Sequence, residues 1–386
     1  MDFKGTRVLV LDGYGRQIAT IVQQLHDLGC IITTLNTSKL DIGYTSHYPK
    51  KKLLHPETRH DMEALKKVLD KEITSGNYDV VFPMLEPSTD VCLQNEETYR
   101  RYVKIIAAPK EAFEKAYNKQ QTMLACMDNN IPCPITKRDT ESLEEYINKV
   151  GYPIAVKPRK GTGSIGFHCI RNKDEFDQLL NKGFVVEDNI IQQYISQTET
   201  QYVGFYMLDK NQDMKLGLVC DKHRWYPIDG GASCYLRTVD RPDIVEDGYR
   251  LLKAIGWQGE AFIDFIADPN DNGIAKVMEI NGRIPASIKM VWVAGASLMK
   301  QELQYAFDEP VDLFDKKVPE GIGLRYFQTD LLWFLKSPNR FKAKPSWFDF
   351  SNSKDYIWSV RDPVPFFSYT MSHLLSYKDD MARRGR

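Results

Sequence analysis

The segment "KVMEINGRIPAS", residues 276–287, decides how the chain is interpreted, because an apolar strand carries polar side chains just before a glycine and an arginine. Successive side chains of a strand point to opposite faces, so we expect Glu279 and Asn281 on one face together with Val277. Two oxygen-bearing side chains aimed at one place predict a ligand there.

The segment before this strand predicts its partner. In "GEAFIDFIADPNDNGIAKVMEIN", residues 269–273 form a dense turn signal between two apolar runs, which indicates a β-hairpin. If Asp268 pairs with Ala275, then Asp264 lies opposite Glu279 and on the same face. Two carboxylates and a nearby amide suit a magnesium ion that is held together with phosphates. The alternative is that each carboxylate pairs with a lysine or faces solvent.

A glycine-rich segment, "IAVKPRKGTGSIG" at residues 154–166, is the second feature with chemical content. An apolar strand delivers Lys157, and the glycines and hydroxyls that follow can place backbone N–H groups against phosphate oxygens. The segment is not a P-loop, because no Gly-Lys-Ser/Thr closes it and because the lysine precedes the glycines. A hairpin that binds no ligand is the alternative.

Two further segments agree with a nucleotide site. We expect Lys119 near the middle of a helix that begins at Glu111, where it shares a side with apolar neighbours and reaches either water or a cleft. The segment "NIIQQYISQTET", residues 189–200, begins apolar and ends polar. That order is expected where a base meets the backbone between two lobes.

The N-terminal segment "TRVLVLDGYGRQIATIVQQLHDLGCIITTLN" predicts a strand, a glycine turn, a helix and a second strand, which is a βαβ unit of a parallel sheet. Gly13 and Gly15 stand in the turn, but Ile18 occupies the position of the third glycine of a dinucleotide fingerprint. A nicotinamide-dependent oxidoreductase is therefore disfavoured.

Composition excludes several classes of partner. The chain has 51 basic and 52 acidic residues among 386, so it lacks the basic field that nucleic-acid binding needs. No segment reaches the roughly 18 apolar residues of a membrane span, and no signal peptide is recognisable, so we expect a cytoplasmic protein. The seven cysteines form no Cys-x-x-Cys pair, which argues against disulfides and structural zinc.

Taken in order, these segments resemble the ATP-grasp superfamily of carboxylate–amine and carboxylate–thiol ligases, in particular the carbamoyl-phosphate-synthetase-like branch that includes D-aspartate ligase. The resemblance covers about residues 1–310 and implies an α/β (α+β) ATP-grasp fold. It implies a Rossmann-like pre-ATP-grasp domain, an N-terminal lobe with a Gly-rich lid, a C-terminal lobe with a metal site, and a C-terminal extension. These divisions fall at residues 1–110, 111–195, 196–310 and 311–386.

The resemblance also implies the roles of individual residues. Arg283 and Lys157 resemble the catalytic cations, and the metal ligands would be Asp264, Glu279 and Asn281. The nucleotide-binding residues would be Lys119, Lys157, Gly161, Thr162, Gly163, Ser164, Gly166, Gln192, Gln193, Tyr194, Ile195 and Glu199. Two features depart from the family pattern: a Gln-Gln pair replaces the usual glutamate in the adenine hinge, and the first metal acid is Asp rather than the more frequent Glu.

The implied activity is that of a ligase. ATP, with one or two Mg²⁺ ions or with Mn²⁺, would phosphorylate a substrate carboxylate, and an amine would then attack the acyl phosphate. Carboxyl-phosphate chemistry on bicarbonate and a non-catalytic ATP-binding regulator are the alternatives. For an anionic, amino-acid-like substrate the polar candidates are His223, Arg224, Tyr235, Arg237, Ser287 and Lys289.

Residues 311–386 mix aromatic side chains with turn residues and end in an arginine-rich stretch. A C-terminal helix that packs on the body is favoured over an interfacial membrane helix. The same aromatic residues would also suit closure of the substrate site or the face of a homodimer.

Overall fold

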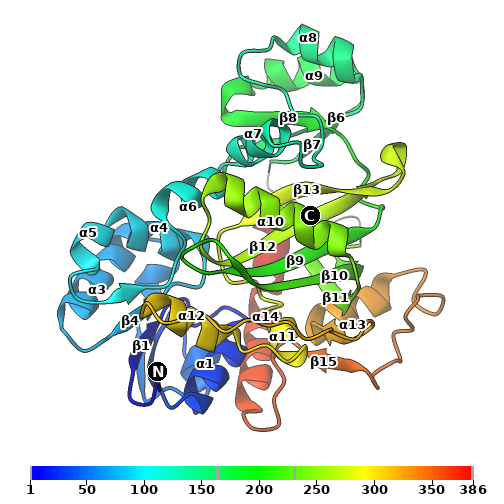
Figure 1. The fold of residues 1–386 in the computed structure, drawn as a ribbon. Coiled ribbons are helices and arrows are strands. Elements are labelled where there is room, and N and C mark those ends of the chain that lie inside the picture. The colour runs from blue at the N-terminus through cyan, green and yellow to red at the C-terminus, as the bar shows by residue number, and fades with distance from the viewer. Residues whose placement is uncertain (1, 162–165, 229–231, 384–386) are drawn as a thin grey trace.

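The structure, a computed structural model, describes residues 2–161, 166–228 and 232–383. Within these ranges the strands form three β-sheets (Figure 1). A five-stranded N-terminal sheet lies beside a seven-stranded sheet, and a small three-stranded lobe stands over the seven-stranded sheet. The mixed α/β architecture agrees with the predicted fold class.

The N-terminal sheet is parallel, with strand order β3-β2-β1-β4-β5. The chain winds from β1 outward through β2 and β3 and then returns to β4 on the other side of β1, so the strand order reverses between β1 and β4. In such sheets ligands bind at the carboxyl ends of the strands near this reversal. The strands are Arg7–Val10, Ile31–Asn36, Lys51–Leu54, Val80–Phe82 and Lys104–Ile105. The helices α1 to α5 are Ile18–Asp27, Ile42–Thr45, Met62–Thr74, Glu86–Gln94 and Glu96–Tyr99.

Two short helices, α6 (Lys110–Tyr117) and α7 (Lys119–Asp128), connect this domain to the small lobe. The expected single helix is therefore interrupted. Asn118 is extended and its side chain accepts a hydrogen bond from the Gln120 N–H, which caps the start of α7. Lys119 is consequently the first residue of a helix, and the prediction that it lies in mid-helix is wrong.

The small lobe is an antiparallel sheet of order β7-β6-β8 covered by two helices. Ser142 and Glu145 form a reciprocal capping box that starts the first helix, because each side chain accepts the other's backbone N–H. The strands β6, β7 and β8 are Ile154–Pro158, His168–Ile170 and Asn189–Gln193, and the helices α8 and α9 are Leu143–Val150 and Lys173–Asn181.

The large sheet has the order β13-β12-β9-β10-β11-β14-β15. Its last two strands come from the C-terminal segment, so that segment is built into the sheet rather than attached to it. The strands β9 to β15 are Gln201–Leu208, Met214–Tyr226, Ala232–Thr238, Gly259–Asp268, Ile274–Asn281, Gly323–Arg325 and Ser353–Asp355. The helices α10 to α14 are Pro242–Ile255, Lys289–Val293, Leu298–Ala306, Phe327–Lys336 and Val364–Arg383.

The hairpin of β12 and β13 has the expected pair but not the expected register at its turn. Asp264 pairs with Glu279, as predicted. At the turn, however, Asp268 pairs with Ile274 rather than with Ala275. The register shifts by one residue between these two pairs, so the strands contain a β-bulge.

The bulge changes which side chains share a face. Met278 has no partner in the register, and as a result Val277 and Ile280 both pack in the buried core on one side of the sheet. Val277 therefore does not share a face with Glu279 and Asn281, and that prediction is wrong. The extra residue turns the last part of β13 so that its two polar side chains point away from the core.

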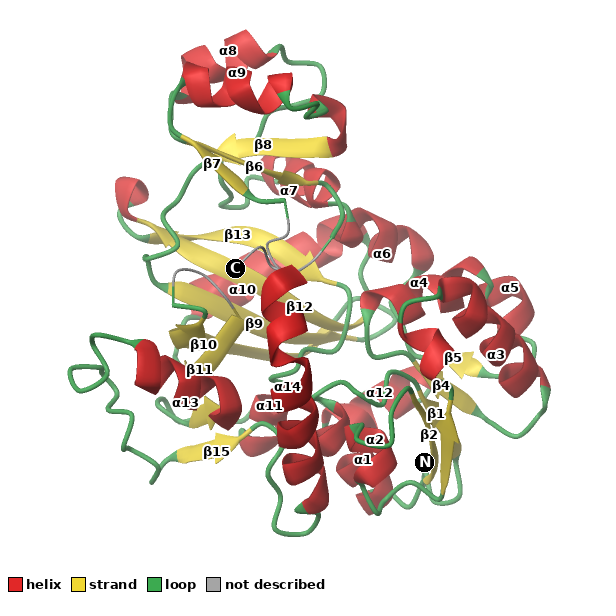
Figure 2. Ribbon diagram, turned by 180° about the vertical axis from the view of Figure 1, so that it is seen from behind, coloured by secondary structure: helices red, strands yellow, loops and turns green. Residues whose placement is uncertain are grey.

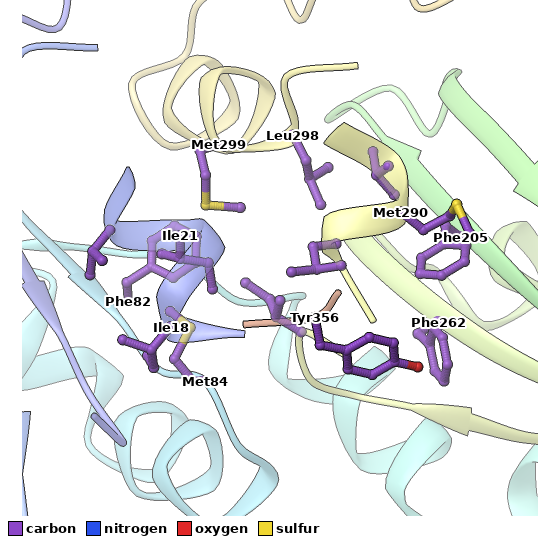
Figure 3. Close-up of a cluster of buried hydrophobic side chains, with 14 of the residues drawn as sticks. Ile18, Ile21, Phe82, Met84, Phe205, Phe262, Met290, Leu298, Met299 and Tyr356 are labelled. Atoms are coloured by element: carbon purple, nitrogen blue, oxygen red, sulfur yellow. The ribbon is translucent and has the colours of Figure 1, made fainter. Parts of the chain in front are cut away.

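One apolar core joins the N-terminal sheet to the large sheet. Figure 3 shows Ile18, Phe82 and Met84 from the N-terminal domain in the same cluster as Phe205 and Phe262 from the large sheet. Met290, Leu298, Met299 and Tyr356 fill the space between them. Because these side chains are buried together, the N-terminal domain is held against the large sheet, with the carboxyl ends of its strands near the end of β13.

The C-terminal helix α14 lies against α2 (Figure 2). Ser368 Oγ is 2.8 Å from Thr45 Oγ1, and Gln328 donates a hydrogen bond to Thr370. The prediction of a helix packed on the body is confirmed for these residues. No helix in the described ranges is both long enough and apolar enough to cross a membrane.

Candidate functional site

The three predicted metal ligands lie together at the ends of β12 and β13. Asn281 Nδ2 donates to Asp264 Oδ2 over 3.0 Å, and Lys222 of β10 donates to the other oxygen of Asp264. Glu279 Oε2 lies 3.5 Å from Lys119 Nζ. The contact of Lys222 was not predicted, because its approach to Asp264 depends on the register of β9, which lies between their strands.

These residues provide only part of a metal coordination shell. Within the described ranges, no group of three or more His, Cys, Asp and Glu side chains could hold a metal ion. A site at Asp264 and Glu279 therefore has two carboxylates and one amide, and its other oxygen ligands must come from a bound molecule or water. Magnesium accepts such an arrangement when phosphates are bound beside it.

Two lysines meet at these carboxylates. Lys119 Nζ donates to the carbonyl oxygen of Gly161 over 2.6 Å, in addition to its contact with Glu279. Lys157 lies near the end of β6, where burial lowers its pKa to about 8. The nearby Glu279 and Asp264 oppose that shift, and the positive charge of Lys119 adds to it. Together with Lys222, these two lysines place three cations beside two carboxylates, so this cationic region has more positive than negative groups.

The glycine-rich segment reaches this cationic region at Gly161. Gly161 and Gly166 have φ values of +124° and +75°, which favour glycine over residues with a side chain. Thr162, Gly163 and Ser164 lie outside the described residues. Their predicted contacts with phosphates stay predictions.

The predicted adenine hinge follows β8. In the register of β6 and β8, Ala155 lies opposite Gln192 and Lys157 lies opposite Ile190, so Gln192 and Lys157 are on the same face of the sheet. Gln192 is fully buried, and neither polar atom of its side-chain amide has a hydrogen-bond partner among the described residues. A buried amide without hydrogen bonds lowers the free energy of unfolding. It therefore marks a place where a polar ligand is expected.

The other residues of the predicted hinge differ in their contacts and burial. Gln193 Nε2 donates to Asp268 Oδ2 over 3.2 Å, which ties the hinge to the large sheet. Ile195 is buried, whereas Tyr194 and Glu199 are half-buried. The Glu199 carboxylate therefore remains accessible beside the hinge.

Arg283, just after β13, connects the large sheet to the N-terminal domain. Its Nε donates to Glu86 Oε1 over 3.0 Å, and its Nη2 lies 3.4 Å from Asn281 Oδ1. Glu86 is the first residue of α4 and is 5% exposed. This partner was not predicted, because the contact spans 197 residues of sequence and no local pattern marks it.

The six predicted substrate residues are not part of the cluster around Asp264, Glu279 and Arg283 in the contacts given above. Arg224 is buried in an ion pair with Asp330, Arg237 donates to a loop carbonyl oxygen, and Lys289 donates to the carbonyl oxygen of Trp358. In the described part of the chain, none of the six lines the large cavity beside Arg283. Their contact with substrate stays a prediction for His223, Arg224, Tyr235, Arg237, Ser287 and Lys289.

That cavity has a volume of about 790 Å³. The loops that follow β1, β2, β3 and β4 line one side, at the strand ends where a doubly wound sheet binds ligands. Tyr117, Gly161, Arg283 and Tyr369 line other parts of it. Gly161 also accepts the hydrogen bond from Lys119, so the cavity adjoins Lys119.

Comparison with known proteins agrees with this geometry. Residues 116–287 match the family described as the ATP-grasp domain. This part of the chain is an ATP-grasp domain. It contains both lysines, the glycine-rich segment and the three predicted metal ligands, whereas most of the N-terminal domain and the C-terminal segment lie outside the match.

Similarity to curated proteins extends over part of the chain. The chain is 24% identical over 198 residues to the methylcrotonoyl-CoA carboxylase alpha subunit of Rattus norvegicus. The match covers 46% of this chain and 26% of that protein. It is also 24% identical over 248 residues to a D-alanine–D-alanine ligase of Paenarthrobacter aurescens, covering 57% and 65%. The chain spans about a quarter of the length of the carboxylase subunits that it matches.

Solved structures show the fold over more of the chain. The biotin carboxylase domain of Hydrogenobacter thermophilus 2-oxoglutarate carboxylase, solved with MgADP and bicarbonate, superposes with a TM-score of 0.66 at 15% identity over 82% of this chain and 73% of that one. An L-amino acid ligase from Bacillus licheniformis superposes with a TM-score of 0.63 at 18% identity over 83% and 79%. The ATP-grasp fold is therefore confirmed.

Proposed function

We propose that this protein is an ATP-dependent ligase that activates a substrate carboxylate as an acyl phosphate and joins it to an amine. The observation that carries the proposal is the meeting of Lys119, Lys157, Asp264, Glu279 and Arg283 beside one large cavity. Phosphoryl transfer needs cations around the transferred group and little covalent chemistry from the protein. This arrangement supplies those cations.

ATP is the proposed nucleotide. Lys119 and Lys157 would contact its phosphates, and the glycine-rich segment would cover them with backbone N–H groups. The hinge at residues 192–195 would hold adenine, and Glu199 would accept hydrogen bonds from the ribose. The orphaned amide of Gln192 supports this placement, because it lies on the face of Lys157 and can donate to and accept from a purine.

Asp264, Glu279 and Asn281 are the proposed magnesium ligands, for one or two ions. The donor set fits, since all three supply oxygen atoms and no sulfur or imidazole is present. When bound there, magnesium would neutralise phosphate charge. The lysines that now contact the two carboxylates fit as well, because each would then face a phosphate oxygen instead.

Arg283 is the proposed catalytic arginine. Glu86 and Asn281 hold its guanidinium at the cavity wall, where the planar fork can contact a phosphate and a carboxylate at the same time. It would stabilise the negative charge that develops during transfer and orient the substrate carboxylate. The carboxylate and the amine would be small molecules, amino-acid-like, bound in the cavity.

The test is ADP release from ATP and magnesium against pairs of amino acids and small carboxylates, with bicarbonate as a separate arm. A ligase releases ADP only with the correct pair, and Glu279→Ala should remove the release. Release that needs bicarbonate would favour the carboxyl-phosphate alternative, which the carboxylase relatives support. Tight ATP binding without release in any arm would favour the regulator.

A further inference from the structure

Two arginines that stack on tyrosine rings, Arg16 and Arg59, line the large cavity. Within the described ranges, neither Arg16 nor Arg59 forms an ion pair with an acidic residue, although both line the cavity. The acids at and behind the cavity wall are already engaged. The charge of Arg59 acts on Asp12, but that carboxylate accepts hydrogen bonds from the Met84 and Leu85 N–H groups and from Ser88. Asp41 accepts hydrogen bonds from the backbone of its own loop, and Glu86 is paired with Arg283. Both guanidiniums therefore line the cavity without an ion-paired carboxylate among the described residues.

Aromatic rings of the C-terminal segment position Arg16. Its Cζ lies 4.3 Å from the ring centroid of Tyr326 and 5.9 Å from that of Tyr356. The hydroxyl of Tyr326 donates to that of Tyr369, which also lines the cavity. The cation–π contacts and a hydrogen bond to Tyr326 hold the guanidinium in place without neutralising its charge, so its remaining hydrogen-bond donors are able to bind an anion.

Arg59 stands at another part of the same cavity. Its Cζ lies 3.4 Å from the ring centroid of Tyr14, and its side chain is exposed to solvent. Arg59 comes from the 3₁₀ helix Pro56–Arg59 after β3, whereas Arg16 comes from the loop after β1. Two different loops thus bring arginines that stack on tyrosine to one cavity, and a guanidinium contacts carboxylate or phosphate oxygens bidentately.

We propose that Arg16 and Arg59 bind an anionic group, a carboxylate or a phosphate, of the substrate that enters this cavity. The substrate therefore carries one anionic group in addition to the group that reacts near Arg283, and the C-terminal segment forms a wall of its site. This inference rests on the ligase function proposed above.

The test uses three amino acids that differ in this group: L-alanine, L-aspartate and O-phospho-L-serine. Each is titrated calorimetrically into the full chain in the presence of magnesium and a non-hydrolysable ATP analogue. At least one of the two anionic probes should bind about tenfold more tightly than alanine, since a bidentate arginine contact is strong. Aspartate and phosphoserine separate a carboxylate site from a phosphate site.

Variants assign the effect to the two arginines. Arg16→Gln and Arg59→Gln should each weaken the preferred anionic probe by about tenfold. Arg101→Gln removes the same charge from an exposed residue that does not line the cavity, and it should bind the probe like the unmodified chain. Because Arg59 is exposed, its variant keeps the test valid even if Arg16→Gln folds poorly.

Three results would overturn the inference: equal binding of alanine and both anionic probes, binding of none of the three, or unchanged affinity in both arginine variants. A separate titration with the ATP analogue alone distinguishes this failure from failure of the ligase proposal. If the analogue does not bind, the proposed function is wrong. If it binds and the anionic probes show no preference, only the present inference is wrong.

Discussion

Two clusters of acids and cations in this chain differ in how completely they are shielded from solvent. In the C-terminal segment, Asp330 contacts Arg224 at 2.6 Å and Arg325 at 3.0 Å, and the three side chains are at most 3% exposed. At the candidate site, Glu279 is 34% exposed and its lysine contact is 3.5 Å. The buried cluster is closed, whereas the site cluster keeps donors and acceptors that can exchange partners with a ligand.

The comparison predicts that the two clusters serve stability and function separately. Asp330→Ala should lower the free energy of unfolding by about 3–5 kcal/mol, because it leaves two guanidiniums buried without an anion. Glu279→Ala should change that free energy by about 1 kcal/mol or less, since its carboxylate is partly solvated. Urea unfolding of both variants measures the difference. Equal destabilisation would show that the site cluster is structural too.

The second prediction concerns the planar guanidinium group of Arg283. Arg283→Lys should keep ATP affinity and lower turnover by about 10- to 100-fold, because an ammonium cannot contact Glu86, Asn281 and a substrate oxygen in one plane. Steady-state ADP release with the active substrate pair measures the loss. Arg241→Lys is the control, since Arg241 pairs with Asp243 at the start of α10 and does not line the cavity. Full turnover in Arg283→Lys would remove its catalytic role.

The local features of this site were predictable from the sequence, and the long-range ones were not. Asp264 and Glu279 were paired correctly because a hairpin turn fixes nearby register. The face of Val277 was wrong, because a bulge that inserts one residue leaves no clear mark in an apolar run. Glu86 and Arg16 were missed, since their roles arise when loops of the N-terminal sheet meet residues distant in the chain.

The third prediction is the smallest, and it tests whether the site cations are incompletely neutralised. Burial lowers the pKa of Lys157 to about 8, so its charge is lost as the pH rises through that value. ATP affinity should therefore fall between pH 7 and 9.5, by up to about tenfold, because a phosphate contact loses its cation. Calorimetric titration with the ATP analogue at several pH values measures this fall.

Lys157→Arg should make the affinity independent of pH over this range, because a guanidinium stays protonated. Lys253 is an exposed lysine on α10, so Lys253→Arg should still lose ATP affinity as the pH rises.

The effect of pH on the free energy of unfolding has the opposite sign. Between pH 8 and 10.5 the unfolded chain binds the Lys157 proton more strongly than the folded chain, so ligand-free protein should gain stability relative to Lys157→Met as the pH rises. A flat affinity profile in the unmodified chain would mean that Glu279 and Asp264 already neutralise Lys157, and the contrast with the closed Asp330 cluster would then disappear.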